Sequence, residues 1–351
     1  MIIRSSFLSV ILGLAICSST IGAKAQQTCF TQGMSQIDSL QGGVLSPPIP
    51  ATAVVTDQGN WEVYWFVKNN LCHPNPKCPT CNLKGGSPID FASGDTYITQ
   101  SDLRVPGLGG GLSLSRTWNS IWPTTATSPR VGLFGPNWRS TYEERVVAGS
   151  DGYMEYSRSD GAIWSFGYTG ATGSNSYPAY APVAPANQTA TLIQGSTSWN
   201  LTFQNGESRT FDSVSGYLTS ITDRNGNTTL LSYDTAYRLT TVTDPGGRHL
   251  YFSYATPSTY FVTGVSSDVG LSLSYTYDAQ GRLIKVTKPD QTTISFQYDS
   301  NSLISAVLDS NGKVLESHTY NNCGQGLTSS RAGGVEALTV SYPPSCALGL
   351  P

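Results

Sequence analysis

An aromatic residue returns at a nearly fixed interval through the C-terminal part of this 351-residue chain. The intervals are 22, 21, 23, 21, 22 and 22 residues. The positions are Phe211, Tyr233, Tyr254, Tyr277, Tyr298, Tyr320 and Tyr342, and four of them are followed by Asp212, Asp234, Asp278 and Asp299. A period of this length indicates a structural repeat. Repeats govern the architecture because each unit must bury its apolar face against a neighbour.

The residues between the aromatics predict a β-hairpin in each unit. An aliphatic residue follows the aromatic by six positions and another comes three later, as in Leu239 and Val242. A turn begins two residues further on, as in Asp309-Ser-Asn-Gly, where glycine supplies the positive φ angle of a tight turn. A lone hairpin of this size cannot bury its apolar face, but stacked hairpins can. We therefore expect residues 201–345 to form a strip of tandem hairpins.

Upstream, residues 85–200 are predicted to form a separate N-terminal β domain. Leu112-Ser-Leu-Ser-Arg-Thr-Trp118 alternates apolar and polar residues, which is typical of a half-buried strand. Thr141-Tyr-Glu-Glu-Arg-Val-Val147 is a further strand candidate, and Ser159-Asp-Gly161 indicates a hairpin turn. Residues 169–190, rich in Gly, Ala, Pro and Asn, are predicted to be a loop or linker. With 36 Gly and 19 Tyr, the composition favours an all-β fold.

The N-terminus has the pattern of a Sec-type signal peptide covering residues 1–25. Arg4 supplies a positive charge, an apolar stretch follows, and Ala23-Lys-Ala25 forms a small-x-small cleavage site. The apolar stretch is too short to span a bilayer as a mature helix, and Ile16 disfavours lipidation of Cys17. We expect the mature chain to be secreted, periplasmic or at the cell surface, and peripheral to the membrane at most.

Removal of that peptide with Cys17 leaves six of the seven cysteines. They are Cys29, Cys72, Cys78, Cys81, Cys323 and Cys346. An even number in an exported chain indicates disulfides. Four lie in the N-terminal segment 26–84, where residues 51–55 and 61–67 are predicted to pair as a hairpin. The Cys72–Cys81 cluster, which includes His73, leaves a zinc site or a redox pair open, although oxidation on export and the flanking prolines favour disulfides.

Candidate active-site residues fail on geometry. Glu143 and Glu144 are adjacent on a predicted strand, so they should point to opposite faces as solvent or rim charges, not flank one glycosidic bond. The Gly107–Gly111 run lacks the Lys-Ser/Thr of a phosphate loop, and Asp223-Arg-Asn-Gly-Asn227 lacks the closing Glu of a calcium loop. The histidines, His73, His249 and His318, fall in different segments and are expected at the surface.

These observations predict a protein that is not an enzyme and uses no cofactor and no metal. A charged fraction of 12% and a net charge of −3 also argue against nucleic-acid binding, which needs clustered Lys and Arg. The Tyr-Asp pairs have two interpretations. Tyr rings at a fixed spacing could stack on sugars, or Tyr could fill the shared core while Asp accepts backbone hydrogen bonds in the turn. Regular spacing favours the structural interpretation.

The stretch that begins Tyr277-Asp-Ala-Gln-Gly281-Arg282 resembles the YD repeat of bacterial Rhs proteins, and weaker copies fall in register around it. Upstream, Pro88-Ile-Asp-Phe-Ala-Ser-Gly-Asp95 and Phe134-Gly-Pro-Asn-Trp138 resemble the N-terminal domain of unknown function that precedes Rhs repeats. The resemblance covers residues 85–345 and leaves residues 346–351 as a C-terminal tail.

Long members of that family coil YD hairpins into a closed shell around a toxic C-terminal domain, or display the shell in adhesion. This sequence has about six units and contains neither the DPxGL-type core motif nor a toxin domain. The resemblance therefore implies a short exported scaffold that interacts with a carbohydrate or a cell-surface protein. The alternative is the N-terminal part of a polymorphic toxin system whose other Rhs or toxin components are encoded nearby.

Cys323 and Cys346 are 23 residues apart, close to one repeat period, so we predict that they are bonded to each other and hold the last unit. Reductant should then open this end first, which limited proteolysis with mass spectrometry can locate. Equal protease sensitivity with and without reductant would contradict the bridge.

Overall fold

A computed structural model describes residues 54–55, 84–85, 88–91, 93–121, 131–149, 152–172, 177–184 and 188–342. The regular structure in these ranges is almost all β, which confirms the predicted fold class. The short 3-10 helices are η1 (Leu108–Gly110) and η3 (Ala332–Gly334). No helix among the described residues is both long and apolar enough to cross a bilayer. The predicted signal peptide and Cys29, Cys72, Cys78, Cys81 and Cys346 lie outside the described residues.

One antiparallel sheet of 20 strands dominates the structure. Strands β9 to β27 pair in chain order, and β1 (Val54–Val55) pairs with β27. The first strands of the sheet are β9 (Arg145–Ala148), β10 (Met154–Ser157), β11 (Ile163–Thr172), β12 (Pro178–Ala184), β13 (Ala190–Gln194) and β14 (Ser198–Phe203). The strands of the periodic region are β15 (Ser208–Asp212), β16 (Leu218–Thr222), β17 (Thr228–Tyr233), β18 (Leu239–Thr243), β19 (His249–Tyr254), β20 (Val262–Ser267), β21 (Ser272–Tyr277), β22 (Leu283–Thr287), β23 (Thr293–Tyr298), β24 (Ile304–Leu308), β25 (Val314–Tyr320), β26 (Gly326–Arg331) and β27 (Val335–Ser341).

The remaining strands precede the large sheet in the chain. A three-stranded sheet has the order β4 (Tyr97–Val105), β5 (Leu112–Asn119) and β8 (Trp138–Ser140). Two small hairpins are formed by β2 (Lys84–Gly85) with β3 (Ile89–Asp90) and by β6 (Val131–Gly132) with β7 (Gly135–Pro136). We call the described residues between 88 and 144 the inner layer.

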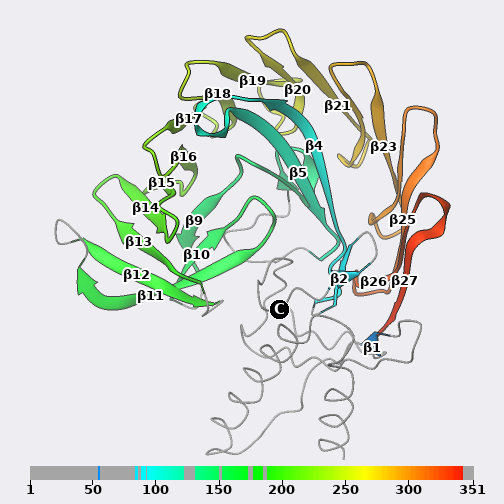
Figure 1. Cartoon of the computed structure of the whole chain (residues 1–351), viewed down its shortest axis with the longest axis horizontal. Coiled ribbons are helices and arrows are strands. Elements are labelled where there is room, and N and C mark those ends of the chain that lie inside the picture. Colours follow the sequence, from blue (N-terminus) through cyan, green and yellow to red (C-terminus); the bar gives the residue numbers. More distant parts are fainter. Residues whose placement is uncertain are drawn as a thin grey trace, which may run out of the picture.

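Each repeated aromatic from Phe211 to Tyr320 coincides with a β-bulge. The pairing register shifts between that aromatic and the residue before it in six successive hairpins. A bulge bends its strand and increases the local twist, so a bulge in every unit curves the whole sheet in one direction. The resulting array is an open arc with a concave and a convex face (Figure 1).

The hydroxyl of each repeated tyrosine from Tyr233 to Tyr320 reaches the preceding unit. Tyr277, for example, donates to the backbone oxygen of Val262 at 2.7 Å. The same bond joins Tyr233 to Leu218, Tyr254 to Leu239, Tyr298 to Leu283 and Tyr320 to Ile304, at 2.7–2.8 Å. Burial raises the pKa of these tyrosines, as expected of phenols that are held neutral in a core.

The aspartates that follow the tyrosines hold the hairpin turns. Oδ1 of Asp278 accepts the backbone N–H groups of Gln280 and Arg282, and Asp234 and Asp299 do the same in their own turns. Gly281 takes the left-handed position of this turn, at φ 76°. The Tyr-Asp pairs thus have a structural role in both halves, the tyrosine between units and the aspartate within the turn.

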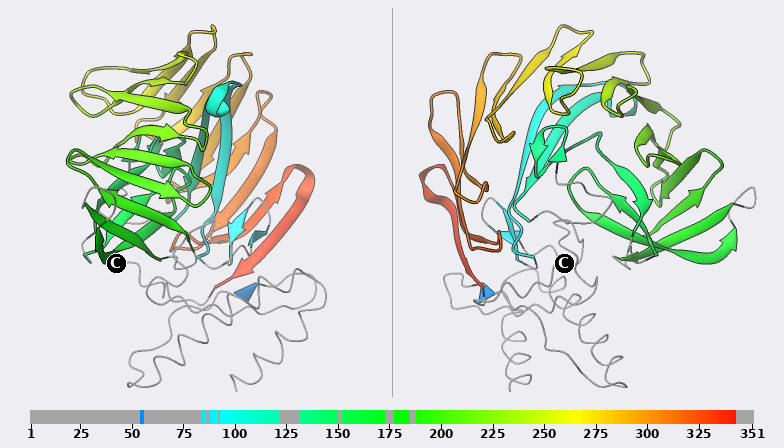
Figure 2. Two further views of the ribbon diagram at one scale, coloured as in Figure 1. Left: turned by 60° about the vertical axis from the view of Figure 1, so that its left-hand side comes forward. Right: turned by 180° about the vertical axis from the view of Figure 1, so that it is seen from behind.

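The inner layer fills the concave face of the arc (Figures 1 and 2). Aromatic rings of the inner layer contact aromatic rings of successive repeat units. In each of these units the contacting ring stands two residues before the repeated aromatic. The ring pairs are Tyr142 with Phe252, Phe134 with Tyr275, and Trp138 with Phe296, at 6.4, 4.8 and 5.1 Å between centroids. Backbone bonds join the two parts as well, from the Val262 N–H to the Leu133 oxygen at 2.8 Å. The inner layer and the repeats therefore share one core.

A buried ion pair lies at the centre of this shared core. Arg116 of β5 donates to both carboxylate oxygens of Asp102 on β4, and each side chain is only 1% exposed. Tyr275 of β21 donates to Oδ2 of the same carboxylate at 2.9 Å. The Arg116 guanidinium also lies 4.6 Å from the Trp138 ring centroid. The repeats thus supply a third hydrogen bond to a carboxylate that is buried in the inner layer.

Three sequence-based boundaries differ from the structure. Residues 169–190 include the end of β11 and all of β12, which pair with each other, so much of the predicted linker is a hairpin. The boundary drawn at residue 200 falls inside β14 (Ser198–Phe203), because the large sheet begins well before the periodic aromatics. Val54 and Val55 do form a strand, but they pair with β27, and residues 61–67 lie outside the described ranges.

Asp102→Asn should lower the free energy of unfolding by about 3–5 kcal/mol, because it leaves Arg116 buried without its counter-charge. Tyr275→Phe should cost less, about 1.5–3 kcal/mol, since it removes one hydrogen bond to a charged group. Asp290→Asn, in an exposed turn, is the control and should stay within about 0.5 kcal/mol of the parent. Urea unfolding measures all three, and a loss for Asp102→Asn as small as the control's would contradict this role.

Candidate functional site

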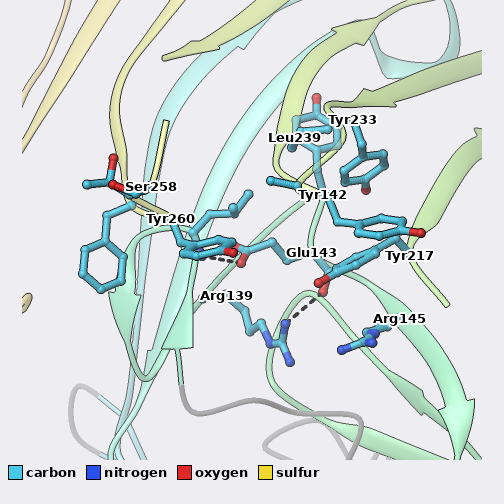
Figure 3. A pocket seen from close by; sticks show the side chains of 15 residues that line it. Arg139, Tyr142, Glu143, Arg145, Tyr217, Tyr233, Leu239, Ser258 and Tyr260 are labelled. Atoms are coloured by element: carbon cyan, nitrogen blue, oxygen red, sulfur yellow. Dashed lines mark hydrogen bonds between the residues drawn. The ribbon is translucent and has the colours of Figure 1, made fainter. Parts of the chain in front are cut away.

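A cavity of about 500 Å³ opens between the inner layer and the hairpins that follow β15, β17 and β19 (Figure 3). Its volume lies within the range of about 300–1,000 Å³ found for small-ligand pockets. The most prominent lining side chains are five tyrosines and three charged residues, namely Tyr142, Tyr217, Tyr233, Tyr237, Tyr260, Arg139, Glu143 and Arg145. We call this cavity the tyrosine pocket.

One wall of the tyrosine pocket is a cluster of aromatic rings from two successive turns. Tyr217 precedes β16, and its ring lies 5.5 Å from Tyr233 and 5.8 Å from Tyr237, nearly parallel to the latter at 24°. Arg145, the first residue of β9, bridges to Tyr217 through the backbone and places its guanidinium 4.7 Å from that ring's centroid. The edge of the large sheet is thereby fastened to this wall.

Tyr237 is held in a left-handed backbone conformation, at φ 58°. The same turn position is glycine in seven other hairpin turns between residues 203 and 326, namely Gly206, Gly226, Gly247, Gly270, Gly281, Gly312 and Gly324. A residue with a side chain is strained there by about 1–2 kcal/mol. Gln291 and Ser302 share the position, but their side chains do not line the pocket. Backbone strain of this kind is a reason to suspect function, because it persists where a side chain is needed.

A second wall is the loop of residues 255–261, which carries Tyr260. This loop makes its unit longer than the others, since Val262 follows Tyr254 by eight residues where the usual aliphatic follows by six. Arg238 holds the loop by donating from Nη1 to the backbone oxygens of Thr256 and Thr259, both at 3.0 Å. Tyr237 and Tyr260 are 53% and 59% exposed, so both rings offer surface to a ligand.

The floor of the pocket contains Glu143 and Arg139. Oε1 of Glu143 accepts the Leu133 N–H at 2.7 Å and Oε2 accepts the Ser140 N–H at 2.8 Å. Burial raises the pKa of the Glu143 carboxyl above its usual range and lowers that of Arg139. Arg139 donates from Nη1 to the Glu143 backbone oxygen and from Nη2 to Ser157 Oγ, at 3.5 and 3.4 Å. Burial likewise raises the pKa of Tyr142 to about 12.

Two expectations about charged residues were wrong. Glu143 and Glu144 do point apart, but they precede β9 and do not lie in a strand. Glu144 is buried and Glu143 is partly buried, since both carboxyls accept hydrogen bonds from neighbouring residues. Glu144 accepts the Tyr156 hydroxyl at 2.7 Å and pairs with Arg209 at 3.3 Å. His318 is 3% exposed. It stands two residues before Tyr320, which is the position that faces the inner layer in the other units.

Other residues singled out in the sequence lie where they were expected. His249 is at the surface and bonds Asp268 at 2.7 Å. Asp223 accepts the N–H groups of Asn225 and Asn227 in a hairpin turn. His73 and Cys346 lie outside the described residues. Cys323 is disulfide-bonded, and its pairing with Cys346 stays a prediction.

The structure brings only one of the repeat-defining residues, Tyr233, to the tyrosine pocket. Tyr217, Tyr237, Tyr260 and Arg145 were not predicted from the sequence as site residues. Two signals for them were present, namely a tyrosine where other turns have glycine and the longer spacing after Tyr254. In the described residues, no group of three or more His, Cys, Asp or Glu is placed to hold a metal ion. The pocket can therefore bind a ligand by aromatic stacking on its tyrosine rings, with a guanidinium beside them.

The fold and this site define a class, a tandem β-hairpin repeat protein whose N-terminal domain packs inside the curve of its own repeats. The family model described as domain of unknown function (DUF6531) matches residues 86–166. The model described as RHS Repeat matches residues 214–249, 262–293 and 277–314. The chain belongs to the Rhs/YD-repeat family, and the suspected resemblance is confirmed.

Curated relatives are much longer than the matched region. The tRNA3(Ser)-specific nuclease WapA of Bacillus spizizenii is 30% identical over 242 residues, which are 62% of this chain and 10% of the relative. The tRNA nuclease WapA of Bacillus subtilis (strain 168) is 29% identical over the same length, with the same shares covered. The chain thus spans about a tenth of the length of these relatives.

Two solved structures show weak similarity. The crystal structure of TcdB2-TccC3-Cdc42 has a TM-score of 0.30 at 15% identity, with 55% of this chain and 12% of that chain covered. The Photorhabdus luminescens Tc holotoxin pore has a TM-score of 0.28 at 14% identity, with 67% and 14% covered.

Replacing Gln291 by glycine should raise the free energy of unfolding by roughly 0.5–1 kcal/mol, because relief of the left-handed strain exceeds the added chain entropy. Tyr237→Gly should gain less, because it also loses the ring contact with Tyr217, worth about 0.5–1.5 kcal/mol. Urea unfolding of the two variants measures the difference. Equal gains would mean that the Tyr237 ring contributes nothing to the wall.

Proposed function

We propose that this Rhs scaffold is exported and acts by binding, not by catalysis, and that the tyrosine pocket is its binding site for a saccharide. The observation that carries the proposal is Tyr237, a large aromatic residue kept in a strained position where most other turns have glycine. Its ring and that of Tyr260 give the pocket two exposed aromatic surfaces of the kind that stack on the apolar faces of sugar rings.

The arrangement of the pocket supports binding over turnover. Both carboxylate oxygens of Glu143 are held by backbone N–H groups, so this group has a structural task in the floor. Arg139 is likewise bonded to the floor through the Glu143 oxygen and Ser157. Export is supported by the signal-peptide pattern of residues 1–25 and by the disulfide at Cys323, since disulfides persist outside the cytoplasm.

A second candidate is a role in a toxin system, as the scaffold part of a larger assembly. It is favoured by the names of the relatives, which are nucleases ten times longer than the matched region. The described part of the concave face is already filled by the inner layer, which argues against an enclosed toxin in this part of the chain. Sequencing of the neighbouring DNA separates the candidates. Further YD units with a toxin and immunity pair would favour the second.

Binding by the chain from Gln26 onward can be tested on a glycan array and then by calorimetry. Tyr237→Asn should weaken saccharide binding about tenfold, because asparagine tolerates the left-handed turn but lacks the ring. Gln291→Asn, in the matching turn outside the pocket, is the control and should bind like the parent. Absence of any saccharide ligand, or cleavage of the bound ligand into products, would overturn the proposal.

A further inference from the structure

Arg145 is placed to bind a negatively charged group of the ligand. Its Nε donates to the backbone oxygen of Ser215 at 3.0 Å, and its guanidinium lies over the Tyr217 ring. These two contacts fix the plane of the group. Its two terminal nitrogens have no hydrogen-bond acceptor among the described residues, although the side chain is only half-exposed and lines the pocket. A guanidinium presents these donors as a fork that matches a carboxylate.

The other charges of the pocket are already engaged. Both carboxylate oxygens of Glu143 accept backbone N–H groups, from Leu133 and Ser140, and Arg139 donates to the backbone oxygen of Glu143. Figure 3 shows Arg139 and Arg145 on the same side of the cavity, with Glu143 between them and Tyr260. Two guanidiniums against one carboxyl group leave the pocket with an excess of positive charge.

We propose that the tyrosine pocket selects saccharides that carry a carboxylate, the uronic acids and related acidic sugars. The Arg145 fork binds the carboxylate, and the exposed faces of Tyr237 and Tyr260 stack on the sugar ring. This inference rests on the proposed function, because it specifies the ligand of the same pocket. The pocket binds the saccharide non-covalently, and no bond of the saccharide is made or broken.

The test compares ligands that differ only in charge. Oligogalacturonate and its fully methyl-esterified form share ring, linkage and hydroxyls, and a reduced form in which the carboxylate becomes a hydroxymethyl group gives a second neutral match. Oligosaccharides of hyaluronan and alginate, with carboxyl-reduced counterparts, extend the comparison to other uronic acids. Calorimetry with the purified mature chain should give at least about tenfold tighter binding of the acidic member of a pair, because a hydrogen-bonded charge pair adds this much.

Arg145→Gln should abolish that preference, so that the acidic and the neutral member of a pair bind with equal affinity. Arg145→Lys should restore part of it, because lysine keeps the charge but not the fork. Arg224→Gln removes one exposed guanidinium from a hairpin turn outside the pocket and serves as the control for net charge. Thermal unfolding checks that each variant is folded.

A measurement on the unmodified chain tests the same inference without depending on the folding of a variant. Raising the salt concentration from 0.05 to 0.5 M should weaken binding of the acidic ligand and leave the neutral one unchanged, because screening acts only on the charged pair. Equal affinity for the two members of every pair would overturn this inference and leave the proposed function standing. Failure to bind any saccharide, acidic or neutral, would overturn both.

Discussion

The β-bulge at each repeated aromatic is the constraint on which the rest of the molecule depends. It recurs in six successive hairpins, and in five of them a tyrosine hydroxyl beside it bonds the backbone of the preceding unit. A sheet bent at each step must curve, and a curved sheet has an inner face that water or protein must fill. The inner layer fills it here, so the repeat and the N-terminal domain are two parts of one core.

The site follows from the same curvature. Where the inner layer ends and the large sheet begins, at Glu144 and Arg145, the chain passes beneath the turns of the first repeats. The tyrosine pocket is the space that this crossing leaves, with Glu143 and Arg139 in the floor and turn tyrosines in the wall. A departure from the repeat pattern, at Tyr237 or in residues 255–261, changes the pocket without disturbing the units, because it lies in turns outside the shared core.

The sequence predicted what depends on local spacing. The hairpins, their turns and the buried aliphatic positions such as Leu239 and Val242 follow from a period that each unit repeats. The filled concave face was missed, although a second column of Phe252, Tyr275 and Phe296 has the same period. Its partners, Trp138 among them, lie far upstream and carry no spacing signal. The pocket was missed for the same reason, because Arg145 and Tyr217 meet only after the sheet has curved.

The bond between Asp102 and Tyr275 joins residues 173 positions apart. The inner layer is made first, yet Phe134 and Trp138 have no ring partners until β21 and β23 exist. Closing so long a loop is slow, and apolar surface stays exposed during the wait. The first domain therefore cannot complete its core until the hairpins that contain β21 and β23 have formed. A chain cut short within the repeats would lose the N-terminal core along with the missing units.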